Sequence, residues 1–171
     1  MKKNFTLIGL FCFLPLLLSA QQGQDFILTL SKDTLYGKIK FSTKSDLIIF
    51  KYKGKKVEFH ASTIDYFGIY EKGQVDIYKT LLNNWEEYIY VKVLDEGKLN
   101  LYYYDTAGNH RYTSADPYRY YIGREDLYPI RMSPRAYKNM MKWMVTDHPD
   151  LLAQMGNYED VPRIIRTYNR F

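Results

Sequence analysis

The sequence predicts an α+β fold, in which a strongly curved antiparallel β-meander or small barrel of about eight strands is followed by three C-terminal helices. From residue 25 to residue 130, apolar and polar side chains alternate with a period of two, and turn residues recur at regular intervals. From residue 133 to residue 171, the apolar residues recur at helical spacing instead. Because no helical stretch separates the strands, antiparallel pairing is favoured over βαβ units.

The first twenty residues have the pattern of a secretory signal peptide. Lys2 and Lys3 precede an apolar run of about 13 residues, and Ser19-Ala20 closes it before a polar segment. The run is shorter than the ~20 residues that a membrane-spanning helix needs. We therefore expect cleavage near Ala20, which would leave residues 21–171 as one α+β domain without a transmembrane segment. An uncleaved N-terminal anchor is the alternative, and an intact-mass measurement would distinguish the two.

Cleavage would also change the charge and the thiol content of the chain. Losing Lys2 and Lys3 lowers the formal net charge from +5 to +3, so basicity does not argue for a nucleic-acid partner. Losing Cys12, the single cysteine, leaves no disulfide, thiolate nucleophile or cysteine-bound metal. The mature protein is therefore expected in the periplasm or outside the cell, and the sequence leaves both locations open.

Eight short runs rich in β-branched and aromatic residues predict the strands. Their expected ranges are Phe26–Leu30, Thr34–Phe41, Leu47–Tyr52, Lys56–His60, Tyr66–Glu71, Val75–Thr80, Tyr88–Leu94 and Leu99–Tyr104. Short segments that contain Gly or Asp lie between several of these runs, and such residues tolerate the positive φ of a tight turn. Consecutive strands are therefore expected to pair as hairpins.

Three short amphipathic helices are predicted after residue 133. Ser133-Pro134 has the residue types of an N-cap followed by proline at the first helical position. A second helix is expected after Asp147-His148-Pro149. The three apolar faces consist of Tyr137, Met140, Met141, Met144 and Val145, then Leu151, Leu152 and Met155, then Val161, Ile164, Ile165 and Tyr168. Helices this short are not stable alone, so they must pack on the sheet or on each other.

Tyrosine is the compositional outlier, with 18 residues in a chain that is 17% aromatic. Strand alternation puts Tyr88 and Tyr90 on one face, and pairing through the Glu96-Gly97 turn would add Tyr102 and Tyr104. The row would be extended by Tyr118, Tyr120 and Tyr121. Flat rings with polar tips suit sugars, peptides or protein partners, so Tyr88, Tyr90, Tyr102 and Tyr104 are the candidate binding residues. The alternative, which is the more common role of such residues, is that the C-terminal helices cover this face and the tyrosines pack as core.

A second cluster is basic. The segment from residue 32 to residue 56 has two acids, Asp33 and Asp46, against eight lysines: Lys32, Lys38, Lys40, Lys44, Lys51, Lys53, Lys55 and Lys56. An anionic envelope glycan or lipid headgroup could be attracted to this charge. Lysine on exposed strands also protects a sheet against edge-to-edge aggregation. We favour this solvated-edge interpretation, and binding to anionic liposomes that persists at high salt would reverse it.

The sequence carries no recognisable catalytic constellation. The histidines His60, His110 and His148 are scattered, and none belongs to a metal-spaced pair. His60, Ser62 and Asp65 supply the residue types of a hydrolytic triad, but no nucleophile elbow accompanies them. A glycine-rich phosphate loop is absent from the sequence. We therefore expect no metal ion and no cofactor, and we name no catalytic residue.

Several segments carry a resemblance that covers nearly all of the mature chain. They are Leu18-Ser19-Ala20-Gln21, Asp33-Thr34-Leu35-Tyr36-Gly37-Lys38-Ile39, Val93-Leu94, Gly97-Lys98-Leu99-Asn100-Leu101-Tyr102-Tyr103-Tyr104, Tyr121-Ile122, Asp147-His148-Pro149 and Tyr168-Asn169. On these residues the chain resembles the small exported proteins of unknown function that are common in Bacteroidota-type bacterial envelopes. The resemblance implies export and a β-then-α domain, and no activity comes with it. Relatives carry Cys where this chain has His148, so no shared thiol chemistry is expected.

These observations predict an exported envelope protein that acts as a non-enzymatic binding or interaction module, with an envelope protein or glycan as its partner. A hydrolase acting on envelope glycan or peptide is one alternative, which a buried acidic pair in a cleft would favour. A structural subunit of an envelope assembly is another, which co-purification with membranes would favour. The sequence does not predict an oligomeric state.

Overall fold

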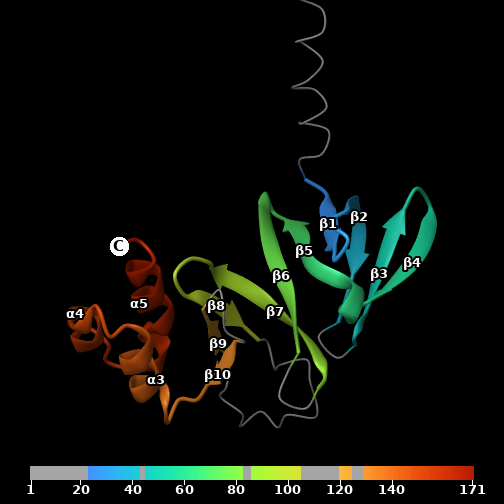
Figure 1. Cartoon of the computed structure of the whole chain (residues 1–171). Helices are drawn as coiled ribbons and strands as arrows, with labels where there is room; N and C mark the ends of the chain where they lie inside the picture. The colour runs from blue at the N-terminus through green and yellow to red at the C-terminus, as the bar shows by residue number, and fades with distance from the viewer. Residues whose placement is uncertain (1–22, 43–44, 83–85, 105–119, 125–128) are drawn as a thin grey trace, which may run out of the picture.

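The computed structural model describes residues 23–42, 45–82, 86–104, 120–124 and 129–171. The expected signal peptide, residues 1–20, lies outside these ranges, as do Lys44, His110 and Tyr118. The described part is an antiparallel sheet followed by three α-helices, so the predicted combination of sheet and C-terminal helices is confirmed (Figure 1). None of the described helices is both long enough and apolar enough to cross a membrane.

Ten strands form the sheet in the described residues. They are β1 (Asp25–Thr29), β2 (Thr34–Lys40), β3 (Leu47–Tyr52), β4 (Lys55–His60), β5 (Ile64–Glu71), β6 (Gln74–Leu82), β7 (Tyr88–Asp95), β8 (Asn100–Tyr103), β9 (Tyr120–Gly123) and β10 (Ile130–Met132). Their order across the sheet is β10-β9-β8-β7-β6-β5-β1-β2-β3-β4. The short 3₁₀ helix η1 (Ala61–Thr63) leads from β4 to β5, and β5 pairs antiparallel with β1 instead of with β4. The sheet is therefore two meanders joined through β1 and β5.

Two of the hairpins are closed by a lysine followed by a glycine in the left-handed backbone region. Lys53 and Gly54, between β3 and β4, have φ values of 47° and 77°. Lys72 and Gly73, between β5 and β6, have φ values of 52° and 84°. Two central residues with positive φ are the mark of a type I′ turn, whose twist matches that of the paired strands. The tight turns predicted at both places are thus present.

The sheet is not closed, and the prediction of about eight strands in a barrel-like curve was wrong. Each of the eight predicted runs overlaps a strand, but β4 and β10 remain as separate edges and β9 and β10 are additional. All four residues of β9 are buried, so this strand shows no alternation in the sequence. The three residues of β10 are too few for a period to be recognised. In the described residues β4 and β10 do not pair with each other, so the sheet stays open, and the helices pack against β8–β10.

The three predicted helices are α3 (Tyr137–Met144), α4 (Pro149–Ala153) and α5 (Val161–Tyr168), with a further 3₁₀ helix, η2 (Tyr158–Asp160), before the last one. Proline occupies the first turn of both α4 and α5, where a missing N–H costs nothing. Ser133 does not cap α3, contrary to the prediction. Its hydroxyl accepts a hydrogen bond from Arg135 N at 3.2 Å, within a turn that precedes the helix.

The apolar side chains form three cores. The first lies between the helices and β8–β10, and it contains Leu101, Ile122, Met132, Met141, Ile164 and Ile165. The second lies inside the first hairpins, and it contains Ile27, Ile39, Ile48, Phe50, Phe67 and Tyr90. The third contains Leu81, Ile89, Val91, Tyr102, Tyr104 and Tyr121. Figure 1 shows the helices beside β8–β10 and the β3–β4 hairpin at the opposite end, so the helices leave the first hairpins uncovered.

Candidate functional site

Three of the four tyrosines expected to form a binding surface are buried. Tyr90, Tyr102 and Tyr104 expose 2%, 1% and 4% of their surface, whereas Tyr88 exposes 39%. The Tyr90 hydroxyl donates a hydrogen bond of 2.8 Å to the backbone carbonyl of Asp46. These three side chains therefore pack as core, as the alternative expected. The helices do not cover them, however, because Tyr90 lies in the second core and Tyr102 and Tyr104 in the third, whereas the helix residues belong to the first.

The four tyrosines also lie on two faces of the sheet and do not form one row. Tyr102 is opposite Val93, and the register between β7 and β8 then shifts before Asp95 pairs with Leu101. Cross-strand partners share a face, so Tyr102 lies with Val93 in the third core, whereas Tyr90 lies in the second. The bulge changes the phase of the alternation, which the sequence pattern does not reveal. Tyr120 and Tyr121 are divided in the same way, between the first and third cores.

A lysine links the buried tyrosines to the turn between β7 and β8. Lys79 Nζ donates a hydrogen bond of 2.8 Å to the Tyr66 hydroxyl and lies 5.9 Å from the centre of the Tyr102 ring. The Tyr66 hydroxyl donates in turn to Glu96 Oε1 at 3.0 Å. Burial, followed by the charge of Glu96, raises the pKa of Tyr66 to about 12. Burial also raises the pKa of Tyr102, so both tyrosines stay protonated near neutral pH, Tyr102 in the third core and Tyr66 at a half-buried position beside it.

His60 does lie between a carboxylate and a hydroxyl, but the carboxylate belongs to Asp46 and not to Asp65. His60 Nε2 is 2.9 Å from Asp46 Oδ2, and His60 Nδ1 is 2.7 Å from Ser62 Oγ. Asp65 forms an ion pair with Lys32 instead. The structure thus assembles the three residue types of a triad on the surface, where 43% of the His60 side chain and 54% of the Asp46 side chain are exposed.

The neighbouring amides identify this trio as a helix cap. His60 is the N-cap of η1, and its Nδ1 accepts a hydrogen bond of 3.2 Å from Ser62 N. Ala61 N donates to the Asp46 carbonyl at 2.7 Å. The two amides are therefore engaged and do not form an oxyanion hole, which is what an acyl-transfer site needs. We assign Asp46, His60 and Ser62 to fixing the connection between β4 and β5. Among the described residues, no group of three or more His, Cys, Asp or Glu side chains is placed to hold a metal ion.

Two adjoining hollows open beside the start of β1, and we call them together the groove. The basic hollow has a volume of about 360 Å³ and is lined by Asp25, Gly37, Lys38, Lys51, Tyr52 and Lys53. The aromatic hollow has a volume of about 570 Å³ and is lined by Phe26, Thr34, Tyr70, Gly73 and Val75. Gly23, Gln24 and Tyr36 line both hollows, so one ligand can contact the two at once. Both volumes are in the range of small-molecule sites.

Strand pairing explains why the lysines gather on the outer face. Lys38 on β2 is opposite Lys51 on β3, which is opposite Lys56 on β4. Cross-strand partners point to the same face, so the three lysines follow one another across three strands. Ile39 and Phe50, one residue away, point to the other face and are buried in the second core. The alternation that builds this core therefore also exposes the lysines.

Gly37 allows the close approach of strands at the floor of the basic hollow. A Cβ at this position would lie 2.5 Å from the Lys51 carbonyl oxygen and 2.6 Å from the Phe50 ring. Both distances are shorter than van der Waals contact, so a larger residue would force β2 and β3 apart. Glycine here is thus explained by packing, in a segment where the sequence predicted only a strand.

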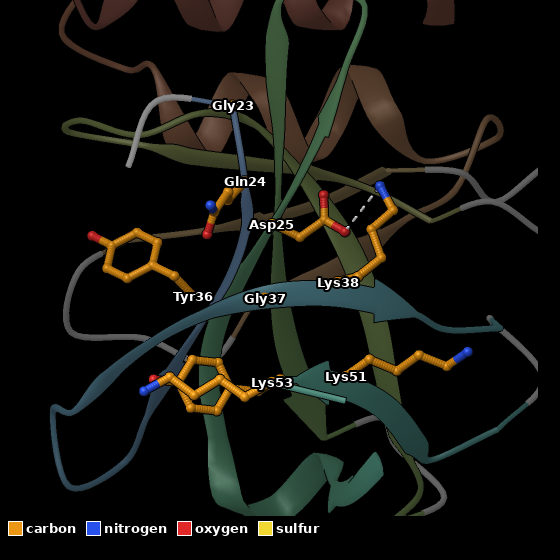
Figure 2. A pocket seen from close by; sticks show the side chains of 9 residues that line it. Gly23, Gln24, Asp25, Tyr36, Gly37, Lys38, Lys51 and Lys53 are labelled. Atoms are coloured by element: carbon orange, nitrogen blue, oxygen red, sulfur yellow. Dashed lines mark ion pairs between the residues drawn. The ribbon is translucent and has the colours of Figure 1, made fainter. Parts of the chain in front are cut away.

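Asp25 is a buried acid at the edge of the basic hollow, with 1% of its surface exposed. Its Oδ2 accepts a hydrogen bond of 2.8 Å from Ile39 N, and its Oδ1 accepts one of 2.9 Å from Tyr70 N. Lys38 Nζ lies 3.5 Å from Oδ2, the contact dashed in Figure 2. The carboxylate thereby ties β1 to β2 and to β5, and it neutralises at most one of the three lysines.

The other two lysines keep their charge available to solvent. Lys51 and Lys53 have no acidic partner within the described part of the chain. Lys53 Nζ lies 5.0 Å above the Tyr52 ring, and Figure 2 shows Lys51 projecting to the same side as Lys38. With Asp25 and Lys38 compensating each other, the basic hollow has an excess of two positive charges.

Sequence reasoning identified the lysines of this site but not the groove. The basic segment from residue 32 to residue 56 contains Lys38, Lys51 and Lys53. The aromatic hollow combines β1, β2 and the β5–β6 hairpin, and Tyr70 and Val75 come from well beyond that segment. Pairing of β5 with β1 brings them together, and local periodicity gives no signal for such a long-range pairing.

Comparison with known proteins gives no identity for this fold or site: no family model, no curated protein and no solved structure matches the chain.

Proposed function

We propose that this protein is an exported, non-enzymatic binding module that holds an anionic ligand in the basic hollow. The observation that carries the proposal is the pair Lys51 and Lys53, which line a hollow and have no acidic partner among the described residues. A concave site lined by one sign of charge concentrates ligands of the opposite sign. The proposed binding residues are therefore not the tyrosines expected from the sequence, because three of those four are core residues.

The position of the lysines favours binding over protection of a sheet edge. The edge strand at this end of the sheet is β4, which carries Lys55 and Lys56. Lys38 and Lys51 are on β2 and β3, which have a hydrogen-bonded neighbour on each side. Lysines on interior strands are not needed to prevent edge-to-edge pairing. The solvated-edge interpretation therefore accounts for β4 and not for the groove.

A binding role also fits the chemistry of the groove better than hydrolysis does. Asp25 is the one acid among the residues described as lining it, and two backbone amides and Lys38 engage its carboxylate. Hydrolysis of a glycan by the usual mechanism needs two carboxyl groups that flank the bond. The groove offers positive charge and aromatic rings, which can bind a glycan but do not by themselves cleave a glycosidic bond.

Export is the second half of the proposal. It is supported by the basic start, the apolar run and the small residues at Ser19-Ala20, and by the resemblance to small exported envelope proteins. An intact mass that corresponds to loss of the first 20 residues, measured on protein recovered outside the cytoplasm, is the expected result. Cytoplasmic protein with those residues attached would contradict this half of the proposal.

Charge reversal tests the binding half. The double variant Lys51→Glu, Lys53→Glu and the matched control Lys138→Glu, Lys142→Glu change the net charge equally, and the control residues are exposed on α3. We expect the first pair to abolish binding to polygalacturonate or to phosphatidylglycerol vesicles, whichever the wild type binds, and the control to leave binding nearly intact. Equal losses in both variants would show that only net charge matters and would contradict a defined site.

A further inference from the structure

We infer that the anionic ligand is a linear acidic polysaccharide, which lies across β1, β2 and β3 with its acid groups on the lysines and a sugar ring on Tyr36. This inference rests on the proposed function and specifies its ligand. Three features of the groove support it: the spacing of the lysines, the composition of the aromatic hollow and the position of the groove on the face of the sheet.

The lysines are arranged for a chain of repeated charges and not for a single anion. Lys38 on β2 and Lys51 on β3 both line the basic hollow as cross-strand neighbours, and adjacent strands are about 4.8 Å apart. This step is close to the length of one monosaccharide unit in an extended chain. Lys53, in the turn after β3, adds a third amine to the same hollow, and Lys56 continues the row on β4 outside it.

A single phosphate or sulfate group would be recognised differently. The most specific sites for such groups use the planar fork of arginine or several convergent backbone N–H groups, to which lysine adds a point charge. The described residues that line the two hollows include no arginine, and the amides of Ile39 and Tyr70 beside them already donate to Asp25. Flexible lysine amines on both sides of the floor suit carboxylates that are spread along a polymer.

The aromatic hollow matches the uncharged part of such a polymer. No charged side chain is among the described residues that line it, and its rings are Phe26, Tyr36 and Tyr70. Phe26 and Tyr36 lie side by side, with ring centroids 6.4 Å apart. A pyranose ring has an apolar face of C–H groups and an edge of hydroxyls, which suits aromatic rings flanked by polar groups such as Gln24 and Thr34. Tyr36 lines both hollows, so a sugar ring on Tyr36 would have its acid group next to the lysines of the basic hollow.

Two other anionic ligands fit this groove less well. A lipid acyl chain in the aromatic hollow would cover Gln24 and Thr34 without replacing their hydrogen bonds to water, which costs free energy. Acidic peptides are bound by arginine clusters, which the described lining residues lack, or as an added strand at a free sheet edge. The groove lies over β1, β2 and β3, each of which has a hydrogen-bonded neighbour on both sides, so no edge is free there.

The test compares the affinity of the purified protein for four probes at equal salt. They are polygalacturonate, the neutral polysaccharide dextran, poly-L-glutamate and phosphatidylglycerol vesicles. The variants are Tyr36→Ala, Tyr36→Thr as a second variant that retains strand propensity, and Tyr88→Ala as the matched removal of a half-exposed tyrosine on β7. Circular dichroism confirms that each variant is folded before its affinity is compared.

Polygalacturonate is expected to bind more tightly than the other probes. Tyr36→Ala and Tyr36→Thr should weaken its binding about tenfold, the loss of one aromatic contact, and Tyr88→Ala should leave it unchanged. If vesicles or poly-L-glutamate bind as tightly as polygalacturonate, or if Tyr36 can be replaced without loss, the polysaccharide inference is overturned and the proposed anion site stands. If none of the three anionic probes binds, both are overturned.

Discussion

Burial raises the pKa of Tyr66 to about 12 from its ordinary value of 10.0, and the charge of Glu96 adds to the shift. The protonated hydroxyl is the form that donates to Glu96 at 3.0 Å. When the pKa of a group is higher in the folded state than in the unfolded state, its stabilising effect is complete at any pH below the unfolded-state pKa. That effect is lost as the pH rises through the folded-state pKa. Tyr66 therefore contributes stability that disappears between pH 10.0 and about 12.

Replacing Tyr66 by phenylalanine should remove this part of the alkaline destabilisation. We expect the free energy of unfolding of Tyr66→Phe to fall less steeply than that of the wild type over this pH interval, as measured by urea denaturation at several pH values. Tyr52→Phe is the control, because Tyr52 is 47% exposed and should behave as the wild type. Parallel curves for Tyr66→Phe and the wild type would show that folding does not raise the pKa of Tyr66.

At the scale of elements, Asn169, just after α5, links the helix to the β7–β8 hairpin by hydrogen bonds, in addition to the apolar contacts of the first core. Asn169 Oδ1 accepts a hydrogen bond of 2.9 Å from Leu99 N, and its Nδ2 donates to the Leu99 carbonyl and to Asp95 Oδ2, each at 2.8 Å. A Cβ on Gly97 would lie 2.7 Å from Asn169 Cγ, so the turn has a glycine where the amide enters. Leu99 itself is fully buried, and water cannot replace these bonds.

The variant Asn169→Ala should therefore lower the free energy of unfolding by about 2–3 kcal/mol, because it leaves a buried N–H and a buried carbonyl without partners. Asn139→Ala, at an exposed position of α3, is the control and should change stability by less than about 0.5 kcal/mol. Chemical denaturation measures both. Similar values for the two variants would mean that the hairpin and α5 are held together by apolar contacts alone.

The same hairpin shows how far element prediction from the sequence extends. The runs around Tyr88–Leu94 and Leu99–Tyr104 are recognisable because β-branched and aromatic residues alternate in them, and both form strands. Their relative register is set by the bulge between Val93 and Asp95, and one extra residue moves Tyr102 to the opposite face from Tyr90. The position of a strand follows from the residues within it and was predicted from the sequence. The register between two strands depends on turn geometry and packing, and it was not predicted.

At the scale of the whole molecule, the helices and the groove lie at different ends of the sheet. Figure 1 shows α3, α4 and α5 at one end beside β8–β10, and the first hairpins at the other. The lysines that line the basic hollow were visible in the sequence as a basic segment, but the floor of the groove depends on Asp25 bonding to β2 and β5. The positive charge of the candidate site was thus predictable from the sequence. The shape of the groove was not, because it depends on the order of the strands in the sheet.

The most direct test of the central claim, that the ligand lies in the groove, is a map of backbone amide chemical shifts during titration of the isotope-labelled protein with polygalacturonate. The account predicts that the largest changes occur at Tyr36, Gly37, Lys38, Lys51 and Lys53, and that they diminish at high salt. Changes centred on Tyr102 and Tyr104, or no changes at ligand concentrations that saturate binding, would contradict it.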